Sequence, residues 1–323
     1  MKEIDLKDKK ILYYLDLDAR LSFSQIGKKV GLPKSVVSYR VSNLKEKQII
    51  TNFYTLINSY KLGYELYRIH ISYQYASPQI KREIIDYFVN YKNSCTVHEV
   101  EGRFDLAVTI YVKDISEFHT FWIQTLSKYR DYFKDLIFSI YFIESTFRYE
   151  FLFDKKIQGE RKQYDLFKDK KIVSIDILDR QILEALTTNA RLPTSDIARK
   201  LGSTAVTVNT RIKKLIKIGV IEGFRTSIDF TKIGYRWYKV DMVLRDYNKA
   251  NQIISYLKTN PNFVGIDRGV GYVDLEVEFY LKSVDQIYSI MNDLANKFPD
   301  SIRNYTYISV IKTHKYSLLP PSD

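Results

Sequence analysis

Apolar residues recur at helical spacing through the first fifty positions of the chain. This spacing predicts helices over residues 4–18, 22–30 and 33–47. Their expected buried faces consist of Ile11, Leu12 and Leu15, then Ile26 and Val30, and then Val37, Val41 and Leu44. Gly31 permits a tight turn before the third helix. Three short helices with a glycine turn before the last one predict a helix-turn-helix.

The starts of the first two helices carry capping signals. Asp5 is expected to cap the first helix, and Ser22 with Gln25 has the spacing of a capping box. Side-chain oxygens at such positions accept hydrogen bonds from backbone N–H groups that have no partner inside the helix.

The apolar period changes after residue 64. Residues 65–75 alternate as a strand does and are rich in aromatic and β-branched side chains. The elements expected next are a helix at 78–91, strands near 94–100 and 103–112, a helix at 114–132 and a strand near 136–148. This order, βαββαβ, predicts a ferredoxin-like domain.

The whole pattern occurs twice. Residues 4–64 laid onto 175–235 without a gap give 23 identities in 61 positions, which indicates an internal duplication. The later elements of the second copy are expected as a strand at 237–245, a helix at 248–259, strands at 262–268 and 272–281, a helix at 283–297 and a strand at 300–315. The expected fold class is α+β, with two copies of a (winged) helix-turn-helix domain followed by a βαββαβ ferredoxin-like domain.

These elements divide the chain into five parts. The expected parts are a first helix-turn-helix domain (1–60), a first ferredoxin-like domain (61–153), a charged linker (154–171), a second helix-turn-helix domain (172–231) and a second ferredoxin-like domain (232–318). The linker is predicted because residues 154–171 hold seven basic and four acidic side chains with little apolar periodicity.

Composition narrows the choice of partners. The chain has 323 residues, a net charge of +12 and 45% hydrophobic residues, so packed domains and a polyanionic partner such as double-stranded DNA are expected. Cys95 is the single cysteine, which excludes a disulfide within the chain. No apolar run approaches the length of a membrane span and the N-terminus does not resemble a signal peptide, so a cytoplasmic protein without a membrane partner is expected.

Several short motifs match one known family of regulators. They are Asp5, Asp8 and Ile11-Leu12; Asp18-Ala19-Arg20 with Asn189-Ala190-Arg191; Gly31-Leu32-Pro33, Val37, Arg40-Val41 and Leu44 with their counterparts from Gly202 to Leu215; and Gly102-Arg103-Phe104-Asp105 with Gly271-Tyr272-Val273-Asp274. With these motifs the chain resembles, twice over, the leucine-responsive regulatory protein (Lrp/AsnC) family of transcription regulators. The resemblance implies a sequence-specific DNA-binding regulator that dimerises through its ferredoxin-like domains. A tandem chain then implies a dimer formed within one chain, a pseudo-dimer, with further self-association expected as in the family.

The third helix of each copy is expected to contact DNA. The positions off its buried face are Lys34, Ser35, Ser38, Tyr39 and Ser42 in the first copy, and Ala205, Val206, Asn209, Thr210 and Lys213 in the second. Asn209 is the best candidate for reading a base, because a side-chain amide pairs bidentately with adenine. Arg40 and Arg211 are also predicted to contact DNA, with pairing to Asp8 and Asp179 inside the domain as the alternative.

By the same resemblance, a small-molecule effector, often an amino acid, binds near the turn after the second strand of the ferredoxin-like domain. The candidate residues are Glu99, Gly102, Arg103, Asp105, Gly269, Gly271 and Asp274. The alternative is a hairpin glycine with an aspartate that caps the turn.

No catalytic residues, metal ligands or cofactor are expected, because the four histidines have no metal-ligand spacing and no nucleophile motif is present. Two alternatives to a regulator remain. One is an architectural DNA-binding protein with little sequence preference. The other is a haem-biosynthesis decarboxylase of similar architecture, with His98, Arg103 and Arg268 as its candidate residues, although the His-Asn-Tyr run of those enzymes is missing.

Overall fold

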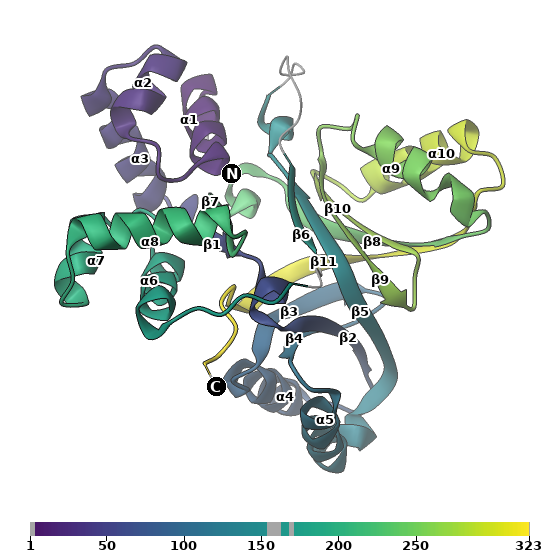
Figure 1. Cartoon of the computed structure of the whole chain (residues 1–323). Helices are drawn as coiled ribbons and strands as arrows, with labels where there is room; N and C mark the ends of the chain where they lie inside the picture. Colours follow the sequence, from purple (N-terminus) through teal and green to yellow (C-terminus); the bar gives the residue numbers. More distant parts are fainter. Residues whose placement is uncertain (1–3, 154–162, 168–170, 323) are drawn as a thin grey trace.

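The computed structural model describes residues 4–153, 163–167 and 171–322 and shows the same order of elements twice (Figure 1). The first copy consists of α1 (Leu6–Leu17), α2 (Phe23–Val30), α3 (Lys34–Glu46), β1 (Ile50–Ile57), β2 (Glu65–Tyr73), α4 (Pro78–Asn90), β3 (Ser94–Gly102), β4 (Leu106–Val112), α5 (Ile115–Tyr129) and β5 (Phe133–Phe147). Next comes β6 (Gln163–Phe167). The second copy consists of α6 (Ile177–Thr188), α7 (Thr194–Lys200), α8 (Ala205–Lys217), β7 (Ile221–Ile228), β8 (Arg236–Leu244), α9 (Ala250–Leu257), β9 (Phe263–Gly271), β10 (Leu275–Leu281), α10 (Asp285–Lys297) and β11 (Ile302–Tyr316). The predicted helix-turn-helix and βαββαβ units are thus confirmed in both copies.

The predicted capping signals are confirmed in the first helix-turn-helix domain, which we call head 1 (α1–α3). The Asp5 carboxylate accepts from the backbone N–H of Asp8 at 2.8 Å, and the Asp8 carboxylate accepts in return from the backbone N–H of Asp5 at 3.3 Å. Ser22 and Gln25 form the same reciprocal pair at the start of α2. Gly31 ends α2 in the left-handed conformation, with φ of 67°, which a residue without a Cβ adopts at least cost.

A strand that the sequence did not predict follows the third helix of each copy. β1 and β7 pair antiparallel with each other, and this two-stranded ribbon crosses between the copies. Each head then packs on the strand of the other copy. The backbone N–H of Ala19 donates to the carbonyl of Phe224 at 2.9 Å, and that of Ala190 donates to the carbonyl of Phe53 at 2.8 Å.

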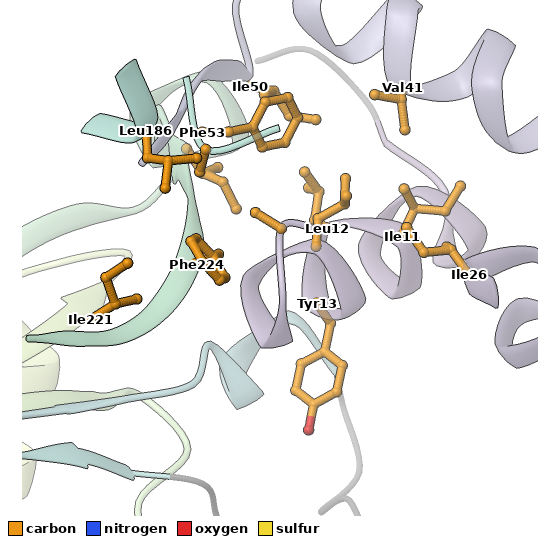
Figure 2. Close-up of a cluster of buried hydrophobic side chains, with 14 of the residues drawn as sticks. Ile11, Leu12, Tyr13, Ile26, Val41, Ile50, Phe53, Leu186, Ile221 and Phe224 are labelled. Carbon is orange, nitrogen blue, oxygen red and sulfur yellow. The ribbon is translucent and has the colours of Figure 1, made fainter. Parts of the chain in front are cut away.

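The hydrophobic core under the ribbon is shared by head 1 and by head 2 (α6–α8). Buried side chains from both copies form one cluster, and Figure 2 shows Leu186 of the second copy next to Phe53 of the first. The hydroxyl of Thr55 on β1 also donates to the carbonyl of Leu186 at 2.8 Å. Because the cores are continuous, the two heads form one body rather than two independent modules.

The two ferredoxin-like sheets close into one barrel. The strand order is β2-β4-β3-β11-β8-β10-β9-β5, and β5 also pairs with β2, so the ring is complete. The two seams between the copies, β3–β11 and β5–β9, are related by the duplication. Helices α4 and α5 cover the outside of the first sheet, and α9 and α10 cover the second (Figure 1). Among the described helices, none has the length and apolar character needed to cross a membrane.

Part of the segment predicted as a linker is a strand. Residues 163–167 form β6, which extends the sheet beside β5 and buries Tyr164 and Leu166. The Tyr164 hydroxyl donates to the carbonyl of Leu17 at 3.0 Å, so β6 also contacts head 1. Two apolar residues in alternation were too short a pattern to predict this strand. Residues 154–162 and 168–170 of the predicted linker lie outside the described residues.

Candidate nucleic-acid interface

The third helices, α3 and α8, present the predicted positions to solvent. Their buried faces are Val37, Val41 and Leu44 in α3, and Val208, Ile212 and Leu215 in α8. Tyr39 is 71% exposed and Val206 is 77% exposed, and Asn209 lies on the same open face of α8. The remaining predicted positions are exposed at Lys34, Ser35, Ser42, Ala205, Thr210 and Lys213, and half-buried at Ser38. The two helices therefore expose different side chains to solvent, although their buried residues occupy equivalent positions.

Arg40 and Arg211 are engaged inside their own heads. Arg40 Nη1 lies 2.7 Å from a carboxylate oxygen of Asp5 and 2.9 Å from one of Asp8. Arg211 forms the equivalent ion pairs with Asp176 and Asp179, the latter at 3.2 Å. These contacts hold the first helix of each head against the third. These ion pairs are the ones that the intradomain alternative expects for both arginines, and a contact of either arginine with DNA stays a prediction.

Arg20 and Arg191 join the two heads. Arg20 Nη1 donates to the carbonyls of Ala190 at 2.6 Å and Leu192 at 3.2 Å. Arg191 Nη1 donates in return to the carbonyls of Ala19 and Leu21, the latter at 2.9 Å. This reciprocal exchange fixes the orientation of one head relative to the other.

A buried ion pair that sequence reasoning missed ties head 1 to the second copy. Arg225 on β7 contacts Asp16 on α1 through two hydrogen bonds of 2.8 and 2.9 Å. Arg225 also donates to Thr146 Oγ1 at 2.9 Å and to the carbonyl of Phe147 at 3.1 Å, both on β5. One side chain thus connects a DNA-binding head, the ribbon and the barrel. No local pattern in the sequence indicates this role, because the partners of Arg225 lie 78 to 209 positions away.

The predicted effector residues lie at the seams and at the turns between the middle strands. An oxygen of Asp105 accepts from the N–H of Tyr73 at 2.7 Å, and one of Asp274 accepts from the N–H of Leu244 at 2.7 Å. Arg103 stacks on Tyr272 at 4.4 Å, which brings the two turns together. The carboxylate of Glu99 faces His314 Nε2 at 3.2 Å.

The glycines at these turns allow close backbone contact across the seams. A Cβ on Gly102 would lie 2.6 Å from the carbonyl oxygen of Tyr307, and one on Gly271 would lie 2.5 Å from that of Phe138. A Cβ on Gly269 would lie 2.0 Å from the carbonyl oxygen of Ile140. The fold therefore accounts for the presence of glycine and aspartate at these turns without a ligand. Effector binding at the turns stays a prediction.

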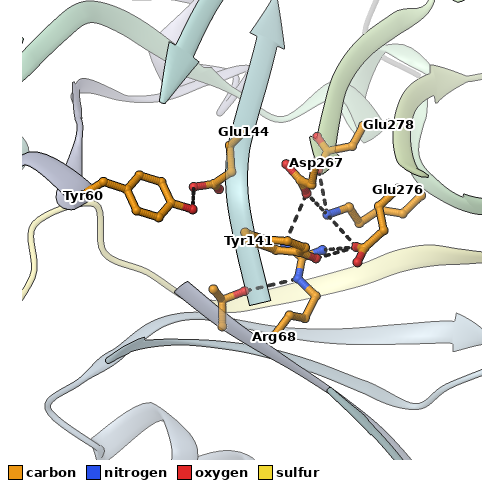
Figure 3. Close-up of polar contacts among 9 residues, drawn as sticks. Tyr60, Arg68, Tyr141, Glu144, Asp267, Glu276 and Glu278 are labelled. Carbon is orange, nitrogen blue, oxygen red and sulfur yellow. Dashed lines mark hydrogen bonds and ion pairs between the residues drawn. The ribbon is translucent and has the colours of Figure 1, made fainter. Parts of the chain in front are cut away.

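The interior of the barrel is charged, and the two copies contribute different charges. Arg68 of the first copy and Lys239 of the second meet three carboxylates, those of Asp267, Glu276 and Glu278 (Figure 3). At the four positions where the second copy has acidic residues, the first copy has other residue types. The second copy has Asp241, Asp267, Glu276 and Glu278, and the matching positions of the first are His70, His98, Ala107 and Thr109.

Burial shifts the protonation of several interior groups. It raises the pKa of Glu144 and of Asp241 to about 8, so both carboxyl groups are largely protonated at neutral pH. It lowers the pKa of His98 to about 3, which keeps that imidazole neutral. His98 Nδ1 lies 3.0 Å from Thr313 Oγ1, and the ring packs edge-on against Trp237. These contacts account for His98 as a structural residue.

No group of three or more His, Cys, Asp or Glu side chains in the described part of the chain is arranged to hold a metal ion.

Comparisons with known proteins identify the heads. A family described as "AsnC-type helix-turn-helix domain" matches residues 175–216, and one described as "Winged helix-turn-helix DNA-binding" matches residues 4–51. The matches therefore cover one head in each copy.

Curated relatives include archaeal regulators. An HTH-type transcriptional regulator of Pyrococcus furiosus is 31% identical over 125 residues, which is 39% of this chain and 83% of that protein. The HTH-type transcriptional regulator Ptr1 of Methanocaldococcus jannaschii is 32% identical over 118 residues, 36% of this chain and 78% of that protein. FL11 of Pyrococcus horikoshii is 29% identical over 143 residues, 44% of this chain and 93% of that protein.

Solved structures of a decarboxylase match the chain along its length. The match to the siroheme decarboxylase NirDL spans 97% of this chain and 94% of the NirDL chain, with a TM-score of 0.64 and 14% sequence identity. At this identity the likeness shows a shared fold alone. The heads, their family matches and the named relatives decide the assignment: the chain belongs to the Lrp/AsnC family of DNA-binding helix-turn-helix transcriptional regulators.

Proposed function

We propose that one chain acts as a pseudo-dimer that binds an asymmetric double-stranded DNA site, with α3 and α8 reading different half-sites. The observation that carries the proposal is the reciprocal contact of Arg20 and Arg191, which locks two unlike heads into one body. A symmetric dimer binds two identical DNA half-sites. Two different third helices held in a fixed relative orientation suit two half-sites of different sequence.

The charges inside the barrel support pairing within one chain. Two first copies paired with each other would bury Arg68 twice without the four acidic residues of the second copy, and Glu144 of each copy would be the carboxyl group left near it. A buried cation that loses carboxylate partners is destabilised. The first copy therefore fits a second copy better than it fits itself, and covalent linkage supplies that partner at high effective concentration.

Base reading is expected to be unequal between the heads. Asn209 can pair bidentately with adenine through its amide, whereas Ser38, at the matching position of α3, offers one hydroxyl. Lysines flanking the third helices, such as Lys28, Lys29 and Lys217, are exposed and suit phosphate contacts. Much of the affinity is then electrostatic and falls steeply with salt.

The test is a selection of bound duplexes from a random library at one fixed salt concentration of about 150 mM. The proposal expects a motif with two unequal halves separated by about one helical turn or a multiple of it. Broad AT-rich enrichment without a motif would instead support the architectural alternative, and a palindromic motif would exclude the asymmetric reading.

The variant Asn209→Ala assigns one half-site to α8. We expect it to weaken binding to duplexes with that half intact by about 1–3 kcal/mol, because one bidentate base contact is lost. The matched control is Ser38→Ala, which should leave that half-site readable and affect the other half by less. Binding measured by fluorescence anisotropy on duplexes with either half scrambled separates the two effects. An equal loss on both scrambled duplexes, or no loss, contradicts the assignment.

A further inference from the structure

The exposed face of α8 carries four side chains in one line along the helix, which we call the outer stripe. They occupy positions i, i+3, i+4 and i+7, a spacing that places them on one side of a helix, away from its buried residues. The members, all exposed, are Val206, Asn209, Thr210 and Lys213. From the start of the helix to its end the stripe offers an aliphatic group, an amide, a hydroxyl and a cation. Such a surface can make apolar, hydrogen-bonding and ionic contacts at successive points of one ligand.

The matching stripe of α3 has a different character. The duplication places Ser35, Ser38, Tyr39 and Ser42 at the same four positions. Each of these side chains offers a hydroxyl, and none is aliphatic, an amide or a cation. Hydroxyl groups bond to several kinds of base edge and therefore discriminate little among bases. The aliphatic member of the outer stripe, Val206, thus has no counterpart in α3.

Val206 stands in the first turn of α8 and is 77% exposed. A single exposed apolar residue is common at protein surfaces and needs no explanation by itself. Its place is informative, because the N-terminal residues of a recognition helix are the ones that contact base edges. The helix cap fixes this turn, since the backbone N–H of Thr207 donates to Thr204 Oγ1 at 3.1 Å. A valine in a helix also keeps one preferred rotamer, so its methyl groups have a defined position before DNA binds.

Ion pairs hold the other side of α8 against head 2. Lys214 Nζ lies 3.0 Å from a carboxylate oxygen of Asp179 on α6, and Arg211 contacts the same carboxylate at 3.2 Å. Lys213 is the neighbour of Lys214 in the sequence but lies on the outer stripe. These contacts fix the rotation of α8 in the head, so the outer stripe faces away from it.

The major groove of DNA offers Val206 a methyl group, the one at C5 of thymine. Asn209, three residues further along the outer stripe, is the candidate for an adenine. Three residues of a helix rise by about 4.5 Å. Successive base pairs are about 3.4 Å apart. The two side chains therefore match neighbouring base pairs.

We propose that Val206 is a specificity-determining residue that packs on the 5-methyl group of a thymine, in the base pair next to the adenine that Asn209 reads. Two contacts then distinguish this A·T step from other sequences at α8, whereas the hydroxyls of α3 discriminate less. The inference rests on the proposed function for the placement of α8 in the major groove. It requires neither two unequal half-sites nor pairing within one chain.

Deoxyuridine tests the methyl contact, because it differs from thymidine only in lacking the 5-methyl group. Binding of the full chain to a duplex of alternating dA and dT is compared with binding to the same duplex with dU at every dT, by fluorescence anisotropy. Every register of this duplex places a thymine beside an adenine, so the comparison needs no selected site. We expect the thymine duplex to bind about fourfold more tightly, which corresponds to one buried methyl group.

The variant Val206→Ser gives α8 the residue that α3 has at this position. It should bind the two duplexes about equally, because its side chain has no methyl group to pack on thymine. The matched control is Ser35→Ala in α3, which should keep the fourfold ratio. Thr210→Ser removes the other methyl-bearing side chain of the outer stripe and should also keep the ratio. All three positions are exposed, so the variants should unfold at the same urea concentration as the wild type.

Equal binding of the wild type to the two duplexes overturns the proposal, and so does a fourfold ratio that survives in Val206→Ser. Loss of the ratio in Thr210→Ser, with the ratio kept in Val206→Ser, assigns the methyl contact to the threonine and likewise overturns it. In a duplex selected from the random library, single dU substitutions should weaken binding only at a thymine next to the adenine that Asn209 reads. If no asymmetric motif is selected while the ratio holds on the alternating duplex, the proposed function fails and the role of Val206 stands.

Discussion

The buried pair of Asp16 and Arg225 offers the sharpest test of how head 1 is held to the rest of the chain. The side chains are 0% and 4% exposed, and they make two parallel hydrogen bonds. Asp16→Asn keeps the shape of the side chain but removes its charge and places an amide beside the guanidinium. Arg225 then keeps a buried positive charge without a carboxylate in contact, which Thr146 Oγ1, the carbonyl of Phe147 and the ring of Tyr149 offset only in part.

The expected loss follows from the burial of the pair. Removing one partner of a buried ion pair costs about 3–5 kcal/mol, because the remaining charge stays desolvated without compensation. The exposed pair of Asp5 with Arg40 provides the contrast. Asp5 is 52% exposed in its side chain, so the loss of its charge in Asp5→Asn should cost about 1 kcal/mol or less beyond its capping role.

Urea unfolding at neutral pH, followed by circular dichroism, measures both variants. A loss below about 1 kcal/mol for Asp16→Asn would falsify the reasoning, since it would mean that water or a rearranged side chain compensates Arg225. The double variant Asp16→Leu with Arg225→Met should recover much of the stability, because apolar groups of similar volume need no compensation. If the double variant is no more stable than Asp16→Asn, the charge is not the cause of the loss.

Two further predictions concern the barrel. Gly102→Ala should destabilise the chain by more than about 1 kcal/mol, because its Cβ would lie 2.6 Å from the carbonyl oxygen of Tyr307 across a seam. The control for backbone strain is Gly202→Ala, which is also at positive φ but has nothing within 4 Å of its Cβ. Equal losses of stability in urea unfolding would show that the seam contact is not the cause. Glu144→Gln should flatten the loss of stability between pH 7 and 8. Burial raises the pKa of Glu144 from 4.5 to about 8, so its stabilising contribution is fully present below 4.5 and is lost as the pH rises through 8, at up to about 1.4 kcal/mol per pH unit. Asp241, with a pKa also raised to about 8, keeps part of that slope in the variant, and unfolding midpoints that fall as steeply as those of the wild type would contradict the role of Glu144.

The exposed face of each third helix could be predicted from the sequence, because the buried stripe at i, i+4 and i+7 fixes which positions remain outside. For Arg40 and Arg211 the sequence left two alternatives open, a DNA contact or pairing inside the head, and it did not indicate that Arg20 and Arg191 join the two heads. Arg40 pairs with Asp5 and Asp8, more than 30 positions away, and Arg20 contacts carbonyls 170 positions away. A sequence shows that such a side chain can reach a phosphate or a carboxylate, but only the packed structure shows which group lies within 3 Å.

Features that depend on neighbours along the chain can be predicted from the sequence alone. Helix caps such as Ser22 with Gln25, the stripe of Val37, Val41 and Leu44, and the repeated βαββαβ order all arise from interactions within a few residues or from one period of burial. The duplication was readable as well, since it needs only the chain compared with itself.

The pairing of the two copies, by contrast, depends on long-range packing. β1 (Ile50–Ile57) escaped prediction because its strand faces both the heads and the barrel, so its burial does not alternate. The seams and the reciprocal arginines join residues more than 115 positions apart, and so does the ion pair of Arg68 with Glu276. Their energies depend on the closure of a barrel from two halves. No local pattern encodes that closure, because each half leaves its edge strands unpaired until the other half is in place.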